Sequence, residues 1–166
     1  MIKMPDLLEF NDLPLSWPEY EKKVYKIFLD ELINYKAMYK GSPVYCHFHP
    51  PQDGFGATFC HITSYDEKEY GRVPDKNRCA RIKWLKVLIE NPDEFKCWVK
   101  FHNKQRPKER HYIWSDSDDF VVILGKRIVK GKERFELITA YCTDKPYTRD
   151  KFQKAYLEFL DTTKAA

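Results

Sequence analysis

The chain has 166 residues, of which 43% are hydrophobic and 33% are charged, a composition typical of globular proteins rather than disordered ones. The formal net charge of +4 and the pI of about 8.7 permit a polyanionic partner without requiring one. Aromatic residues reach 16%, which suits a β-containing core or a surface that stacks bases. Core packing is the simpler explanation for most of them.

Targeting signals and cysteine usage indicate the compartment. No apolar run approaches the ~18 residues of a membrane span, and residues 1–10 lack the basic-then-apolar layout of a signal peptide. The chain contains five cysteines, an odd number, and no C-x-x-C pair. We therefore expect a cytoplasmic protein with reduced, mostly buried thiols, no membrane partner and no cofactor.

The first predicted helix has a recognisable start. Ser16 can cap it, and Glu19 follows three residues later, which is the spacing of a capping box. Apolar residues then recur at helical spacing, so the helix is predicted over residues 17–40, with Gly41 ending it. Residues 1–14 are expected to form an irregular arm.

Two runs of strand-forming residues follow the first helix. They cover residues 44–49 and 57–63 and are separated by a Pro- and Gly-containing turn, which predicts a β-hairpin. A polar loop is expected over residues 65–73. A second helix is predicted from about residue 75 to about residue 90, where an Asn-Pro pair ends it.

The last part of the chain is strand-rich. The predicted elements are strands over residues 95–102, 109–114, 120–126 and 134–142, a tight turn over 130–132, and a closing amphipathic helix over 148–160. This order predicts an α+β fold with a curved antiparallel sheet of four to six strands and helices packed on one side. We expect one domain over 1–166, in which 1–41 form the arm and long helix, and 42–166 form the hairpin, second helix, four-strand meander and C-terminal helix.

One histidine and two arginines suggest phosphate chemistry. Imidazole exchanges protons near neutral pH, so His61 is the leading candidate for an acid or base. A strand histidine bonded to backbone is the alternative. Arg78 and Arg81 are three residues apart on the predicted second helix and should share a flank, where guanidinium groups can hold phosphate oxygens. A solvated basic helix face is the alternative for both.

Other residues could assist such a site. Arg72 precedes the predicted second helix, Lys83 adds positive charge, and Trp84 could stack a base, although packing also explains this tryptophan. On the last predicted strand, alternation places Thr139 and Tyr141 on one side, opposite Ile138 and Ala140. Ordinary β propensity explains the Thr and Tyr equally well.

A structural zinc site is another hypothesis that the sequence raises. Cysteine and histidine, the usual zinc ligands, occur on both arms of the predicted hairpin, at Cys46, His49, Cys60 and His61. No standard zinc spacing is met, and strand alternation would send Cys60 and His61 to opposite faces. We therefore predict no metal ligands.

Four short strings carry a resemblance to a known group of proteins: HITS (61–64), RVPD (72–75), RCARIKW (78–84) and FELITAY (135–141). The chain resembles phage- and prophage-associated bacterial proteins of the barnase–EndoU–colicin–RelE-like (BECR) nuclease superfamily. The resemblance covers about residues 58–156 and leaves out the long N-terminal helix. It implies a helical N-terminal part on a four-stranded antiparallel sheet.

The resemblance also implies an activity, metal-independent RNA cleavage by a toxin-type endoribonuclease. His61 would act as general base or acid, and Arg78 and Arg81 would stabilise the phosphate charge. Thr139 and Tyr141 would orient the phosphate or supply a proton. Substrate binding would involve Arg72, Lys83 and Trp84. The expected partners are RNA and an antitoxin or immunity protein; the alternative is a non-catalytic phage-derived module that binds nucleic acid or protein.

Overall fold

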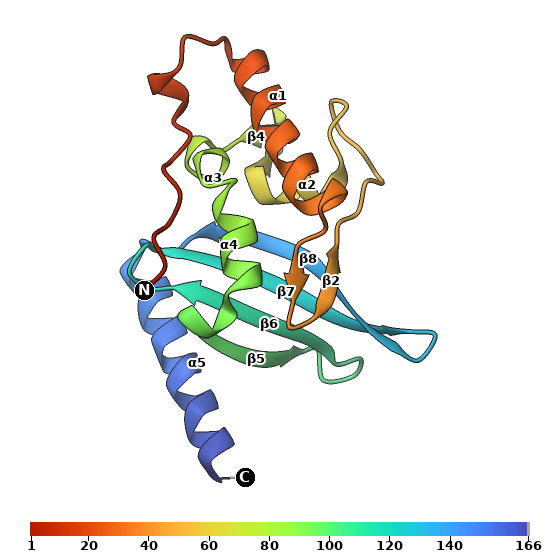
Figure 1. The fold of residues 1–166 in the computed structure, drawn as a ribbon, viewed down its shortest axis with the longest axis vertical. Helices are drawn as coiled ribbons and strands as arrows, with labels where there is room; N and C mark the ends of the chain where they lie inside the picture. The colour runs from red at the N-terminus through yellow and green to blue at the C-terminus, as the bar shows by residue number, and fades with distance from the viewer. Residues whose placement is uncertain (166) are drawn as a thin grey trace.

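A six-stranded sheet forms the centre of the protein in the computed structural model, which describes residues 1–165 (Figure 1). The strand order is β1-β2-β8-β7-β6-β5, and neighbouring strands are antiparallel except for the parallel pair β2 and β8. The strands are β1 (Met38–Tyr39), β2 (Ser42–Tyr45), β5 (Lys96–His102), β6 (Lys108–Ser115), β7 (Phe120–Val129) and β8 (Lys132–Cys142).

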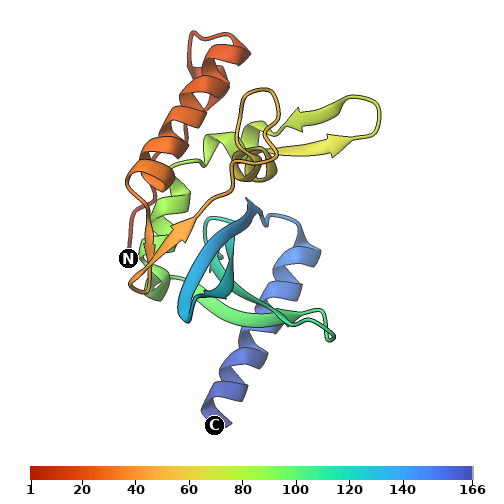
Figure 2. The same ribbon diagram turned by 90° about the vertical axis from the view of Figure 1, so that its right-hand side faces the viewer.

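Helices cover both faces of this sheet. They are α1 (Trp17–Phe28), α2 (Ala57–Thr63), α3 (Lys76–Ala80), α4 (Trp84–Glu90) and α5 (Pro146–Ala165), with short 3-10 turns at Phe10–Asp12 and Pro92–Glu94. Figure 2 shows α1 and α4 on one side of the sheet and α5 on the other. The predicted α+β class is confirmed, but the prediction that the helices pack on one side is wrong.

Two apolar clusters explain this arrangement. The larger joins α1 and α4 to one sheet face through residues such as Val24, Leu88 and Leu124. The smaller lies on the opposite face, where Phe152 of α5 packs against Trp98 and Trp114. Strand alternation supplies apolar side chains to both faces of β5–β7, so a helix on one face alone would leave the other apolar surface in water.

The first helix begins where the sequence predicts it and ends earlier. Ser16 and Glu19 form the reciprocal capping box, with Ser16 N–H donating to the Glu19 carboxylate at 2.8 Å. The α-helix ends at Phe28 and continues as a π-helix over Leu29–Asn34. The predicted end at residue 40 is wrong, because β1 and β2 form a hairpin there. Gly41, with φ of +82°, lies in its turn.

The predicted strand over residues 57–63 is wrong, because this segment is the helix α2. Its β-branched and aromatic residues favour a strand locally. In the structure five of its seven side chains are buried, and Phe59 belongs to the larger apolar cluster. The preceding loop accepts hydrogen bonds from the first turn of the helix, since the N–H groups of Ala57 and Thr58 donate to the carbonyls of Phe48 and His47. Tertiary packing therefore overrides strand propensity.

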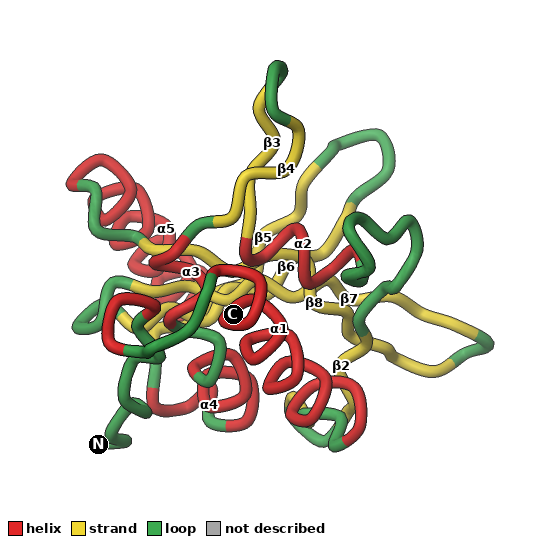
Figure 3. Tube along the Cα trace, turned by 90° about the horizontal axis from the view of Figure 1, so that it is seen from above, coloured by secondary structure: helices red, strands yellow, loops and turns green. Residues whose placement is uncertain are grey.

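The next segment also differs from prediction. The expected loop over residues 65–73 is a two-stranded hairpin of β3 (Ser64–Glu67) and β4 (Gly71–Pro74), which projects from the rest of the molecule (Figure 3). The predicted second helix is two helices, because Arg81 leaves the helical conformation at φ −99°, ψ 16° and ends α3. The four-strand meander β5–β8 is confirmed. Within residues 1–165, no helix has both the length and the apolar character that crossing a bilayer requires.

Candidate functional site

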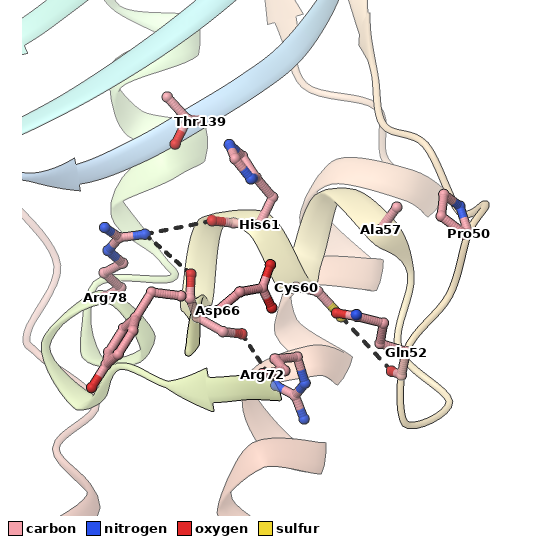
Figure 4. A pocket seen from close by; sticks show the side chains of 11 residues that line it. Pro50, Gln52, Ala57, Cys60, His61, Asp66, Arg72, Arg78 and Thr139 are labelled. Carbon is pink, nitrogen blue, oxygen red and sulfur yellow. Dashed lines mark hydrogen bonds between the residues drawn. The ribbon is translucent and has the colours of Figure 1, made fainter. Parts of the chain in front are cut away.

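A pocket of about 470 Å³ lies between α2, the β3–β4 hairpin and β8 (Figure 4). It exists because β2 pairs with β8 only at Phe135 and Glu136, so the outer edge of β8 beyond Glu136 is not covered by a described strand. The lining residues are Pro50, Gln52, Ala57, Cys60, His61, Ser64, Tyr65, Asp66, Arg72, Arg78 and Thr139.

His61 presents its imidazole to this pocket. Within α2, Ala57–Thr63, it is the one exposed residue, whereas Phe59, Cys60 and Ile62 are buried. Burial of its neighbours fixes the orientation of the helix, so the ring points outward toward Thr139, as Figure 4 shows. The alternative of a strand histidine bonded to backbone is not what the structure shows.

Arg78 places a cation beside His61. Its Nη1 donates to the main-chain oxygens of His61 at 3.5 Å and Ser64 at 3.4 Å, which ties α3 to the end of α2. One carboxylate, Asp75, lies 3.6 Å from Arg78 Nε. The side chain remains 25% exposed, so part of the guanidinium is available to an anion in the pocket.

The last strand contributes two hydroxyl groups. Thr139 lines the same pocket as His61, and Tyr141 lines an adjoining cavity of about 410 Å³ that also contains Arg78. Burial raises the pKa of the Tyr141 hydroxyl above its ordinary value of 10, with Tyr112 adding to the effect and Arg78 opposing it. Arg78 therefore borders both cavities.

The register of β8 differs in one respect from simple alternation. A β-bulge lies between the pairs Ile123–Thr139 and Leu124–Leu137, so Ile138 is an extra residue. Ile138 consequently packs in the α5-side cluster together with Tyr141, and the prediction that these two side chains face opposite sides is wrong. The bulge interrupts the alternation of side chains at position 138, which changes the face on which the following side chains lie relative to the preceding ones.

Arg72 lies in the pocket wall but is already neutralised. Its guanidinium bonds to the Glu21 carboxylate at 2.9 Å, to Asp53 at 2.9 Å and to the Ser64 hydroxyl at 3.2 Å. The bonds to Glu21 raise the pKa of Arg72 further above its ordinary value. Only 8% of the side chain is exposed, so a structural role for Arg72 fits this geometry better than substrate binding.

Arg81, Lys83 and Trp84 do not line the pocket. Arg81 Nη1 donates to the Asn77 carbonyl at 2.8 Å, and its guanidinium lies over the Trp84 ring at 5.0 Å. Trp84 is 6% exposed and donates to the Pro5 carbonyl, so its ring is part of the core rather than a stacking surface. The predicted convergence therefore includes Arg78 but excludes these three residues.

The sequence did not single out several other residues of the pocket wall, notably Gln52, Ser64 and Asp66. Ser64 and Asp66 follow His61 within five positions, so a compact polar run after the histidine was the available signal. Gln52 is brought in by the loop before α2, and no sequence pattern indicates it. Sulfhydryl chemistry is not favoured, because burial raises the pKa of the Cys60 thiol.

The four candidate zinc ligands are not brought together. Among residues 1–165, no three His, Cys, Asp or Glu side chains are grouped so that they could hold a metal ion. The expected hairpin that would have paired their segments is replaced by a loop and α2. All five cysteines are free thiols; two are buried and three are half-buried.

Comparison with known proteins gives no family for this chain. No protein-family model matches it, and neither the curated proteins nor the solved structures include a significant match. A function for this chain is therefore a proposal, argued from the chemistry of the pocket and from the resemblance of the four sequence strings.

Proposed function

We propose that the protein is a metal-independent endoribonuclease of toxin type, as its resemblance to BECR nucleases implies. One observation carries the proposal: the exposed imidazole of His61, the guanidinium of Arg78 and the hydroxyl of Thr139 border one pocket. A proton acceptor and a cation that can hold phosphate are the two groups that cleavage through the ribose 2′-OH needs.

The reaction assigned to these groups is a transesterification. His61 removes the proton of the 2′-OH, the 2′-oxygen attacks the adjacent phosphorus, and the bond from phosphorus to the 5′-oxygen breaks. Arg78 stabilises the negative charge that develops on the phosphate oxygens, and Thr139 orients them. Tyr141, which lines the adjoining cavity, donates the proton that the leaving 5′-oxygen takes up. The products are a 2′,3′-cyclic phosphate and a 5′-hydroxyl.

Incubation of purified protein with RNA in excess EDTA tests this reaction directly. We expect fragments ending in 2′,3′-cyclic phosphate, and His61→Ala should abolish them. His49→Ala is the matched control, because His49 is an exposed histidine outside the pocket lining. Cleavage that persists unchanged in folded His61→Ala protein would refute the assignment of His61.

A non-catalytic module that binds nucleic acid or protein is the second candidate. Two features favour it. His61 is the single histidine among the lining residues, and Tyr141 lines the adjoining cavity rather than the same one. If Tyr141 cannot reach the leaving oxygen, the pocket would bind a phosphate without turning it over. Salt-sensitive RNA binding without cyclic phosphate products would support this alternative.

A further inference from the structure

A second hollowed surface lies between the edge strand β5 and α5. It consists of two adjoining hollows whose linings share Trp98, Lys100, Ala155 and Glu158, and we call it the β5–α5 groove. Neither lining includes His61. On α5, residues 151, 154, 155 and 158 follow helical spacing, so one flank of the helix forms a wall of the groove.

Positive charge gathers around the hollow that Tyr112 and Phe152 also line. Lys100 and Lys151 line it, and Arg110 is the direct partner of Lys100 on β6. The pKa of the His102 imidazole lies below its ordinary value, first because of burial and then because of these three cations. Within the described residues, none of the three forms an ion pair with a carboxylate. Unpaired cations held this close favour an anionic ligand.

The floor of the groove is aromatic and rigid. The rings of Trp98 and Tyr112 stack with centroids 4.9 Å apart and an interplanar angle of 11°, and Phe152 packs edge-on against both. The Tyr112 hydroxyl lies 3.0 Å from His102 Nε2. Trp98, Tyr112 and Phe152 are 3%, 8% and 4% exposed, so these rings belong to the core and give the groove a rigid base beneath the cations rather than a surface on which bases stack.

The groove is connected to the His61 pocket across the sheet. Thr139, Ile123, Tyr112 and Trp98 are successive partners on β8, β7, β6 and β5, so they form one row. Three strand spacings of roughly 4.8 Å make this row about 14 Å long. Trp98, Tyr112 and Ile123 are buried, so this row sets the distance between the two places. A ligand that spans them passes over the neighbouring row, where Lys100 is exposed and Arg110 is half-buried.

The next row of residues on this face of the sheet contains Gly125, whose missing side chain leaves room for the guanidinium of Arg110. Lys100, Arg110 and Gly125 are direct partners, and their side of the sheet is that of Trp98 and Tyr112. A methyl group at Gly125 would come within 2.7 Å of Arg110 Nη1 and 3.0 Å of the Ile138 side chain. The guanidinium thus lies across the glycine, next to the position where Ile138 of β8 approaches it. The direct partner of Gly125 on β8 is Glu136.

The geometry points to a track for single-stranded RNA that leads from the His61 pocket to the β5–α5 groove, with phosphates on Lys100, Arg110 and Lys151. The choice of RNA as ligand rests on the proposed function. The length of the row favours an extended polyanion over a small anion. Glu158 is the carboxylate in the lining, and it borders both hollows.

Fluorescence anisotropy with a labelled single-stranded oligoribonucleotide tests the track in the His61→Ala background, which prevents cleavage. The groove variant Lys100→Gln/Lys151→Gln is compared with Lys22→Gln/Lys23→Gln, which removes the same charge from exposed lysines of α1. We expect the groove variant to bind about tenfold more weakly at low salt. Its salt slope should fall by about 1.4, because each phosphate contact on a single strand contributes roughly 0.7.

Equal affinities for the two double variants would overturn the track, even if the parent protein cleaves RNA. A loss confined to the groove variant would support it, even if the parent protein yields no cyclic phosphate in EDTA and the proposed function fails. Absence of RNA binding by the His61→Ala parent would overturn it as well. Polyglutamate that competes as strongly as RNA of equal charge would assign the groove to an acidic protein and also overturn it.

Discussion

Arg78 is anchored to the backbone of the residue that it is proposed to assist: its Nη1 lies 3.5 Å from the carbonyl oxygen of His61. The two residues are 17 positions apart in the sequence and come from different helices, α3 and α2. The bond to backbone holds the guanidinium at the end of α2, the helix that carries His61. Preorganisation of this kind is what an electrostatic contribution to catalysis requires.

Arg78→Ala should therefore reduce RNA cleavage by about 10²–10³-fold, the usual cost of removing one preorganised donor. Arg78→Lys should recover part of the rate, because it keeps the charge and loses the planar fork. Initial rates with a labelled RNA measure both. Arg134→Ala is the matched control, since Arg134 is exposed and lies over Tyr45 outside the pocket. An Arg78→Ala rate equal to that of Arg134→Ala would show that Arg78 holds no phosphate.

Arg72→Ala should destabilise the fold. The side chains of Arg72 and Glu21 are 8% and 7% exposed, so removing the guanidinium leaves a buried carboxylate without its partner. Breaking such a pair costs about 3–5 kcal/mol in the free energy of unfolding. Urea denaturation measures this loss. Arg106→Ala, on an exposed loop, should change stability by less than roughly 0.5 kcal/mol.

A second variant separates the charge from the packing. Arg72→Met/Glu21→Met removes both charges and should recover much of the stability lost in Arg72→Ala, because no buried charge is left unpaired. A loss in Arg72→Ala no larger than in Arg106→Ala would contradict a structural role. It would also return Arg72 to the list of candidate phosphate ligands.

Local patterns in the sequence predicted the elements that local forces stabilise. The capping box of Ser16 and Glu19 marks the start of α1, and alternation marks the β5–β8 meander. The secondary-structure predictions failed in segments whose conformation depends on tertiary contacts. Around Phe59, β-branched neighbours predicted a strand, but the segment is the helix α2. The ring of Phe59 packs among the rings of Tyr25, Phe28 and Phe55.

The candidate site was predicted in part for the same reason. His61 and Arg78 were found from residue chemistry, yet their contact depends on an α2 that the sequence did not indicate. Arg81 was expected to share a flank with Arg78, but it ends α3 and turns toward Trp84. The pairing of Arg72 with Glu21 joins residues 51 positions apart, and no spacing rule reports such a contact.

The thiols should be unreactive in the folded protein. Burial raises the pKa of both Cys46 and Cys79 to about 12 and that of Cys97 to about 11, so almost no thiolate is present at pH 8. Labelling with a disulfide reagent should be slow in native conditions, and all five thiols should react quickly in guanidinium chloride. Rapid native labelling of Cys46, Cys79 or Cys97 would contradict the burial described here.

Stability should fall as the pH is lowered from about 7 to about 5, because of His111. This side chain is 9% exposed; its Nδ1 lies 3.0 Å from the Tyr39 hydroxyl and its Nε2 2.7 Å from the Glu109 carboxylate. Burial lowers the pKa of His111 below its ordinary 6.5; Glu109 opposes this, and Lys40 and Lys126 add to it.

The direction of the pH effect follows from that lowered pKa. Between the folded pKa and 6.5, the unfolded chain binds more protons than the folded protein, so the free energy of unfolding rises with pH. The contribution is complete above pH 6.5 and is lost as the pH falls through the folded pKa. His102, whose pKa is also lowered by burial and nearby cations, acts in the same direction.

His111→Gln isolates the buried residue, because glutamine can still bond to Tyr39 and Glu109 but does not titrate. Urea unfolding at pH 7.5, 6.0 and 5.0 compares it with the parent and with His49→Gln, an exposed histidine. We expect the parent and His49→Gln to lose stability in parallel, and His111→Gln to lose less over the same range. Parallel losses in all three proteins would mean that His111 does not resist protonation in the fold.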